Sequence, residues 1–309
     1  MDNLRFGIHS AQMFSNFDDC LEIWTRAEDL NFDFACVFDH FRTPDSPNNP
    51  CFEGLSLLAG LSAKLNTIRC VMMVLSVSNR HPALVANMVS TIDHISKGRL
   101  EIGLGLGADD LAHQEYGFIF PQIEQRAEIF ESYCTILDGL LYKNNFSYSD
   151  KHFKLENANL MPKPIQKKVP LIIGGGGEKT IKLAARHADI WNVFCNSDIE
   201  SYIKKIDLLS RECEEIGRNP KDIRKSILFK AIIVENHNEL NKIINNGIDS
   251  ITYEQLQKRG YLLIGTTDQL LQRITELKEI GVGDFVLTVR NQHDIRSMEL
   301  LASNVIPYL

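Results

Sequence analysis

Residues 169–191 read VPLIIGGGGEKTIKLAARHADIW, and this stretch contains the pattern that decides the fold. Val169 to Ile173 is a short apolar run rich in β-branched residues, which predicts a strand. Gly174 to Gly177 then form a turn whose backbone can approach a ligand without hindrance from Cβ atoms. From Glu178 the apolar residues follow helical spacing, and 189–194 is apolar again. The stretch therefore predicts a strand, a glycine turn, a helix and a second strand.

The glycine turn is a candidate phosphate site. A glycine loop that leads into a helix leaves amide N–H groups free at the positive end of the helix dipole. A tight turn with no ligand is the alternative, and the motif by itself does not decide between them. No Gly-Lys-Ser/Thr follows, so the turn is not a P-loop. It also lacks the spacing and the early position of a Rossmann fingerprint.

The same alternation of strands and helices extends through the chain. Besides 169–173, seven segments read as strands, at 4–9, 32–38, 68–77, 99–104, 189–194, 227–234 and 285–289. A shorter apolar segment lies at 262–264. Eight parallel strands that alternate with helices predict a single (β/α)8 barrel of residues 1–309, with insertions near 143–168 and 237–260. An open doubly wound sheet is the alternative fold, but it usually carries its glycine loop on the first crossover.

Composition limits the partners. The 309 residues carry 33 Lys+Arg and 40 Asp+Glu, a net charge of −7, which argues against nucleic acid and anionic membranes as default partners. No apolar run reaches transmembrane length and MDNLRFGIHS lacks a signal-peptide core. Seven scattered cysteines without C-x-x-C spacing fit a reducing cytoplasm and no structural zinc. We expect a cytoplasmic protein without a metal site, because no ligand cluster has the required spacing.

In a (β/α)8 barrel the active site lies at the carboxyl ends of the strands. That rule collects a set of residues from distant parts of the chain: His9, Asp39, His40, the 75–81 and 105–110 turns, Gly174–Gly177, Phe194 and Cys195. Histidine can exchange a proton near neutral pH and a neighbouring carboxylate can orient it, so Asp39 and His40 are the candidate catalytic pair. The alternative is that His40 only bonds to a loop carbonyl.

Other residues at these strand ends have simpler interpretations. His9 reads as a satisfied strand-end histidine, and Cys195 as a buried bystander. Asp109 and Asp110 could form an acid pair, but we expect them to cap a helical turn. Arg80 precedes a helix start and could reach a phosphate or a carboxylate.

Several of these segments together resemble the bacterial luciferase-like flavin oxidoreductases, and most of all the branch that uses the deazaflavin coenzyme F420. The likeness runs along nearly the whole chain. It is carried by FDHF (38–41), NRHPALVANMVSTIDHISKGRLEIGLGLG (79–107), PKPIQKKVPLIIGGGG (162–177), AARHADIWN (184–192) and IGTTDQL (264–270). The resemblance implies a barrel that binds a flavin or deazaflavin over its mouth, in a homodimer.

The resemblance also implies roles for individual positions. Asp39 and His40 correspond to the pair beside the reacting face of the ring, with His40 as proton donor or acceptor. Met73 and Val74 correspond to a non-prolyl cis peptide that bulges behind the ring, and Gly107 to a position that lets the ring approach. Cofactor phosphate would lie on the backbone amides of Gly175, Gly176 and Gly177.

The chain departs from the family pattern at two positions. Ala108 stands where many members have tryptophan or glutamate, and Pro44 stands where a sugar-phosphate-oxidising relative has tryptophan. Both differences argue against a sugar-phosphate substrate, and the acid is missing unless Asp109 replaces it.

Three functions follow as hypotheses. The first is an F420-dependent oxidoreductase that transfers a hydride between the cofactor and a small organic substrate. The second is a reduced-FMN-dependent monooxygenase of the same family. The third is a non-catalytic flavin-binding barrel, which Ala108 and Pro44 make conceivable.

Overall fold

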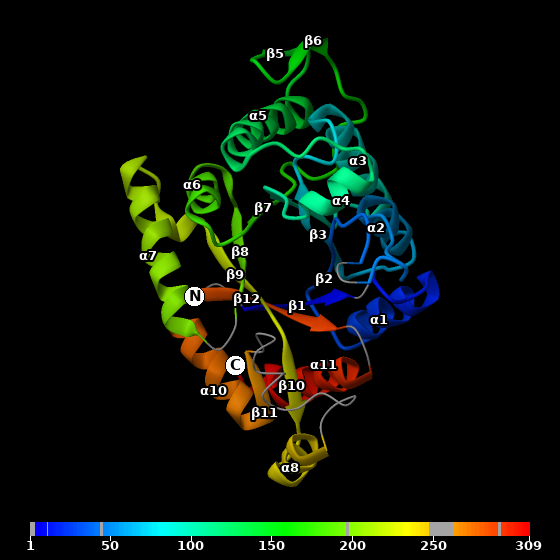
Figure 1. Ribbon diagram of the computed structural model, residues 1–309, viewed down its shortest axis with the longest axis vertical. Coiled ribbons are helices and arrows are strands. Elements are labelled where there is room, and N and C mark those ends of the chain that lie inside the picture. The colour runs from blue at the N-terminus through cyan, green and yellow to red at the C-terminus, as the bar shows by residue number, and fades with distance from the viewer. Residues whose placement is uncertain (1–3, 11, 44–45, 196–197, 247–261, 290–291) are drawn as a thin grey trace.

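A computed structural model describes residues 4–10, 12–43, 46–195, 198–246, 262–289 and 292–309. Eight parallel strands close into a barrel in the order β1-β12-β9-β8-β7-β4-β3-β2, and helices surround it (Figure 1). The barrel strands are β1 (Arg5–Ser10), β2 (Phe34–Val37), β3 (Arg69–Ser76), β4 (Leu100–Gly105), β7 (Leu171–Gly174), β8 (Ile190–Phe194), β9 (Arg224–Phe229) and β12 (Val282–Val289). The predicted (β/α)8 barrel is confirmed, and the open-sheet alternative is excluded.

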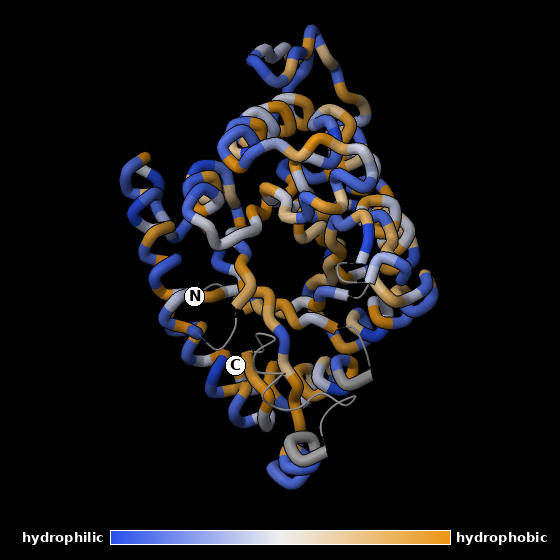
Figure 2. Tube along the Cα trace, in the orientation of Figure 1, coloured by the Kyte–Doolittle hydropathy of each residue, from blue (hydrophilic) through white to orange (hydrophobic). Residues whose placement is uncertain are grey.

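The helices follow the strands as the periodicity predicts. They are α1 (Phe17–Asp29), α2 (Gly54–Ser62), α3 (Pro82–Ile95), α4 (Asp110–Glu115), α5 (Ile123–Tyr142), α6 (Glu178–His187), α7 (Ile199–Glu215), α8 (His237–Asn246), α10 (Thr267–Glu279) and α11 (Gln292–Asn304), with 3-10 turns at Pro220–Asp222 and Ile306–Tyr308. Their buried faces pack on the outside of the barrel, and Figure 2 shows hydrophilic stretches concentrated on the outer helices.

One predicted strand was wrong in its extent. The apolar run 227–234 is divided: β9 ends at Phe229, and β10 (Ala231–Val234) leaves the barrel and pairs in parallel with β11 (Leu263–Thr266). All four residues of β10 are buried, and only Lys230 interrupts the apolar run, at the point where the strand changes its partner. The short apolar segment predicted at 262–264 lies largely in β11.

The two insertions lie at opposite edges of the molecule (Figure 1). Within 143–168, β5 (Phe146–Ser149) and β6 (Lys154–Ala158) form an antiparallel hairpin beyond α5. Within 237–260, α8 lies near β10 and β11, and residues 247–260 lie outside the described part of the chain.

The interior of the barrel is layered along its axis. At the amino ends of the strands, Arg5 contacts Glu101 at 2.7 Å and Asp284 at 2.6 Å, and Arg69 contacts Glu101 at 2.5 Å. Arg224 also pairs with Asp284. Above this ion layer lies an apolar cluster of Phe34, Cys36, Val71, Met73, Ile172, Ile190 and Val286. These two layers fill the lower barrel and leave the carboxyl ends of the strands for a site.

Candidate active site

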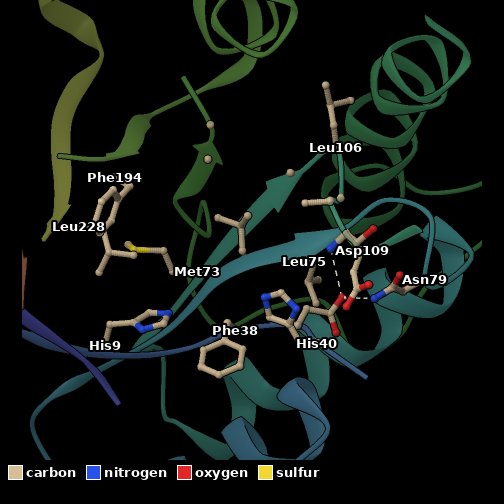
Figure 3. A pocket seen from close by; sticks show the side chains of 18 of the residues that line it. His9, Phe38, His40, Met73, Leu75, Asn79, Leu106, Asp109, Phe194 and Leu228 are labelled. Carbon is tan, nitrogen blue, oxygen red and sulfur yellow. Dashed lines mark hydrogen bonds between the residues drawn. The ribbon is translucent and has the colours of Figure 1, made fainter. Parts of the chain in front are cut away.

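A cavity of about 790 Å³ lies at the carboxyl ends of the strands, and every barrel strand or the residue that follows it contributes to its lining. His40 and Gly175 both line it, although they are distant in the sequence. Figure 3 shows His9, Phe38 and His40 along one side of this cavity and Asn79 and Asp109 farther along it. The strand-end rule therefore brought together the right parts of the chain.

Val74 forms part of the cavity wall, and glycines make room for it. A methyl group added to Gly103, Gly105 or Gly174 would lie 2.6, 2.7 or 2.8 Å from a Val74 methyl carbon, well inside van der Waals contact. The Met73–Val74 peptide is cis, as the family resemblance predicted. Gly103, Gly105 and Gly174 are therefore required by the packing of Val74.

The Asp39 carboxylate is a buried hub of the β3–α3 turn. It accepts hydrogen bonds from the Ser76 amide at 3.1 Å, from Asn79 Nδ2 at 2.8 Å and from both terminal nitrogens of Arg80 at 2.9 and 2.8 Å. Only 2% of its side chain is exposed. Asp39 thus holds this turn in place, while its charge still acts on the neighbouring His40.

Arg80 does reach a carboxylate, as its position suggested, and in fact contacts two. Besides Asp39 it pairs with Glu53, whose side chain caps α2 by accepting the amide hydrogens of Leu55 and Ser56. Because these two carboxylates occupy the guanidinium, we do not assign Arg80 to a phosphate.

His40 lines the cavity with its edge against Phe38, at 5.2 Å between ring centroids. Burial lowers the pKa of His40 below its usual value of 6.5, and the negative charges of Asp109 and Asp39 oppose that shift. The neutral imidazole is therefore the form present at neutral pH, and it can accept a proton from a ligand.

Asp109 lines the cavity and also caps α4. Its Oδ1 accepts the amide hydrogen of Ala112 at 3.0 Å, which is the capping interaction that the sequence predicted. Asp110 is exposed and accepts a hydrogen bond from Gln114. The two aspartates therefore have different environments and do not form a symmetrical acid pair. The neighbouring Ala108 is exposed at the cavity and brings no acid, and Pro44 lies outside the described residues.

The glycine turn leads from the cavity into α6. Gly175 lines the cavity at φ +136°, its amide donates to the Asn192 carbonyl at 2.9 Å, and its carbonyl accepts from Trp191. Gly177 is the N-cap residue of α6 and no side chain caps that helix. Uncapped first-turn amides suit an anion. Gly107, another predicted position, lies at φ +79° against Ser76 and Phe120.

Sequence reasoning missed residues that reach the site from distant elements. Thr288 of β12 and Lys230 after β9 line the cavity, together with Phe194 of β8, which the strand-end rule had already included. Lys205 of α7 lies against Gly176, with its Nζ 3.2 Å from the position that a Cβ would take. Register and helix packing place these residues, and neither can be read from local sequence.

Three further findings concern the described residues. Cys195 is buried and does not line the cavity, and burial raises the pKa of its thiol to about 11, so it is the bystander that we expected. In the described ranges no group of three or more His, Cys, Asp or Glu side chains could hold a metal ion. Nor does any helix in those ranges have the length and hydrophobicity needed to cross a bilayer.

Comparison with protein families identifies the chain. The model of the luciferase-like monooxygenases matches residues 4–260. The chain belongs to the luciferase-like monooxygenase family. It is thus a luciferase-like oxidoreductase, and members of this family are F420- or flavin-dependent.

Relatives of this luciferase-like protein include both cofactor types. It is 25% identical to an F420-dependent glucose-6-phosphate dehydrogenase of Microbacterium testaceum over 71% of this chain and 66% of that protein. It is 25% identical to a 5,10-methylenetetrahydromethanopterin reductase of Archaeoglobus fulgidus over 99% and 100%, respectively. It is 28% identical to the pyrimidine monooxygenase RutA of Acinetobacter baylyi over 82% and 70%.

Solved structures show the same fold. An F420-dependent secondary alcohol dehydrogenase in complex with an F420-acetone adduct superposes with a TM-score of 0.82 at 19% identity, covering 99% of both chains. A long-chain alkane monooxygenase superposes with a TM-score of 0.84 at 16% identity, covering 99% of this luciferase-like chain and 91% of that one.

Proposed function

We propose that this protein is an F420-dependent oxidoreductase that transfers a hydride between the cofactor and a small organic substrate such as an alcohol, an imine or an activated alkene. The observation that carries this proposal is His40, a cavity imidazole whose pKa is lowered by burial. Hydride transfer to or from an oxygen or nitrogen substrate requires a partner for the accompanying proton, and His40 can be that partner.

The cavity fits a tricyclic cofactor with a phosphate. Val74 offers an apolar surface between three glycines, and the end of the glycine turn at Gly176 and Gly177 leads into the uncapped first turn of α6. Lys205 beside Gly176 adds a positive charge there. When bound, the deazaflavin supplies a carbon centre that exchanges a hydride. The protein orients the substrate over it.

His40 then moves the proton. In the direction of alcohol oxidation the neutral imidazole accepts the hydroxyl proton, and in the reverse direction the imidazolium returns it. The ring of Phe38 packs against His40 and restricts its orientation. Asp39 positions this residue indirectly, because its hydrogen bonds fix the segment on which His40 is carried.

A reduced-FMN-dependent monooxygenase is the second candidate. The 28% identity to a pyrimidine monooxygenase and the 0.84 TM-score against an alkane monooxygenase favour it. The cavity wall at Val74 and the turn before α6 would suit FMN equally well. The two candidates differ in their chemistry with oxygen, because a reduced flavin captures oxygen at C4a and a 5-deazaflavin does not readily do so.

One experiment separates the candidates. Purified protein is titrated anaerobically with F420 and with FMN, followed by absorbance, and substrate-dependent oxygen uptake is then measured with each reduced cofactor. We expect F420 to bind more tightly than FMN, and we expect hydride transfer without oxygen uptake. Tighter FMN binding with substrate-dependent oxygen uptake would establish the monooxygenase instead. Cofactor binding without turnover over a broad substrate panel would support the non-catalytic barrel.

A further inference from the structure

Phe14, in the loop after β1, combines two features that do not help the protein to fold. It lies at φ +63°, in the left-handed region that glycine and asparagine adopt easily and a bulky aromatic residue rarely does. The residue lines the cavity and is 59% exposed, so its ring gains little from burial. Backbone strain of this kind is concentrated at functional sites. Phe14 is therefore a candidate for contact with a ligand.

The surrounding structure fixes Phe14 in this position. Its amide donates to the Pro50 carbonyl at 3.0 Å. The buried side chain of Gln12 binds both backbone groups of Phe38, directly after β2: Nε2 donates to the carbonyl at 2.9 Å, and Oε1 accepts from the amide at 2.7 Å. The loop after β1 is therefore held against the end of β2 by these hydrogen bonds, and not by burial of the Phe14 ring.

Phe41 brings a second ring to the same side of the cavity. The Pro50 carbonyl that accepts from Phe14 also accepts from Thr43 Oγ1 at 3.2 Å, so the loops after β1 and β2 meet at this group. Phe14 and Phe41 both line the cavity. Two aromatic side chains from adjacent loops therefore border one part of it, which we call the aromatic side.

The aromatic side continues to the surface of the protein. Phe41 stacks on Tyr116 and Phe118, with ring centroids 5.3 and 4.8 Å apart, respectively. The buried His113, which also lines the cavity, meets the same ring edge-on at 5.4 Å. Tyr116 and Phe118 are exposed, and an exposed apolar surface that adjoins a cavity is typical of a binding site. Because this surface is continuous with the cavity, a ligand of the cavity is the partner that fits it.

The charges around the aromatic side do not suit an anionic group. Among the described residues that line the cavity, Lys230 is the only lysine or arginine, and its Nζ lies 5.6 Å from the ring centroid of Phe194. Figure 3 shows Phe194 well apart from His40. Arg42 is buried, and its Nε lies 2.8 Å from a carboxylate oxygen of Glu115. The aromatic side therefore suits an uncharged apolar group better than a phosphate or a carboxylate.

We propose that Phe14 and Phe41 bind an aromatic or similarly flat, uncharged group of the substrate. Rings pack on such groups by offset stacking or edge-to-face contact, and the contact removes apolar surface from water. The substrates are then aryl-substituted ketones or conjugated alkenes, or the corresponding alcohols, and not small polar or phosphorylated compounds. This assignment rests on the proposed function, because it takes the cavity as the place where the substrate meets the cofactor.

The test uses matched pairs of compounds in which a phenyl group replaces a methyl group. The pairs are acetophenone with acetone, and benzylideneacetone with ethylideneacetone. Binding to protein loaded with oxidised F420 is measured by saturation-transfer NMR, because the oxidised cofactor cannot reduce these compounds. The values of kcat/KM are then measured with reduced F420. We expect the phenyl member of each pair to bind at least about tenfold more tightly and to have the higher kcat/KM.

Variants at Phe14 show whether this preference arises on the aromatic side. Phe14→Ala should lower the affinity for the phenyl members about tenfold and leave the methyl members within about twofold of the wild type. Phe14→Tyr keeps a ring and should keep the preference. Tyr308→Ala is the matched control, since it removes an aromatic side chain that is 72% exposed and does not line the cavity, and it should bind every compound as the wild type does.

Phe14→Asn separates a binding role from a structural one. Asparagine adopts the left-handed conformation more easily than phenylalanine, so this variant should melt at or above the temperature of the wild type. It should nevertheless lose the preference for the phenyl members. A lower melting temperature with an unchanged preference would mean that Phe14 supports the fold, and would overturn the assignment.

The outcomes separate this assignment from the proposed function. Equal binding of the two members of each pair, no binding of any compound, or a preference that survives in Phe14→Ala would overturn the assignment and leave the F420 proposal in place. Phenyl-selective binding without turnover would support the assignment and count against the oxidoreductase. If the protein binds FMN in place of F420, the same measurements are made on FMN-loaded protein. Phenyl selectivity there, with substrate-dependent oxygen uptake, would support the assignment and overturn the F420 proposal.

Discussion

Arg80 binds both oxygens of the Asp39 carboxylate, at 2.9 Å from Oδ2 and 2.8 Å from Oδ1. The Asp39 side chain is almost completely buried, and it connects the end of β2 to the turn after β3. The acid next to His40 in sequence is thus mainly a structural support. We therefore expect Asp39 to contribute to catalysis by keeping two adjacent loops of the cavity in a fixed relation.

Asp39→Asn should destabilise the protein by about 3 kcal/mol, because the change leaves a buried guanidinium without its main counter-charge. Urea unfolding monitored by tryptophan fluorescence measures this loss. Glu53→Gln is the matched control, since Glu53 pairs with the same arginine but is 43% exposed, and it should cost less than about 1 kcal/mol. Equal losses in the two variants would contradict the hub role of Asp39.

His40→Ala should reduce kcat about a hundredfold or more, since the proton partner is lost, while the Kd of the cofactor stays within about threefold of the wild type. Steady-state rates and cofactor titrations measure the two quantities separately. Phe41→Leu serves as a control for a change in the shape of the neighbouring wall. Full activity in His40→Ala would remove His40 from the mechanism.

Asp109→Asn should shift the acidic limb of the pH–rate profile for oxidation to lower pH. Burial lowers the pKa of His40, and the negative charge of Asp109 opposes that shift, so its removal lowers the pKa further. Oxidation requires the neutral imidazole, and its rate should therefore rise with pH through the pKa of His40, below 6.5 in the wild type. Asparagine is also a good N-cap, so α4 should persist. A limb that stays in place or moves to higher pH contradicts the predicted coupling.

Gly174→Ala should weaken cofactor binding by displacing Val74 into the cavity, because the added methyl would lie 2.8 Å from Val74 Cγ1. Val74→Ala in the same chain should restore much of the binding, since it removes the two crowded methyl groups. Gly177→Ala is the control: nothing lies within 4 Å of its added methyl and its φ is −81°. Cofactor titrations of the three variants check this prediction, and a failure of Val74→Ala to rescue would contradict it.

The sequence predicted the barrel because each buried strand is an apolar run followed by a turn and an amphipathic helix. It also predicted which strand ends meet, since parallel strands of a barrel share one carboxyl face. The division of 227–234 into β9 and β10 was not predicted, because a single lysine between two apolar segments does not by itself indicate a change of partner strand.

The partners of individual side chains were harder to predict. Asp39 was expected to act on His40, yet its hydrogen bonds go to Ser76, Asn79 and Arg80, which follow a different strand. His9 was expected to be an ordinary strand-end histidine, and its relation to Thr288 depends on the register between the first and last strands of the barrel. Such contacts depend on which strands become neighbours when the barrel closes and on their register. A local sequence pattern does not contain this information.

The ion layer at the amino ends of the strands has a kinetic consequence. Arg5, Glu101 and Asp284 seal the lower end of the barrel, and the apolar cluster fills the space above them. A cofactor and a substrate would then both have to enter and leave through the carboxyl end of the barrel. A cofactor bound deeper than the substrate would have to bind first. Turnover should therefore be ordered, with the product released before the cofactor can be exchanged.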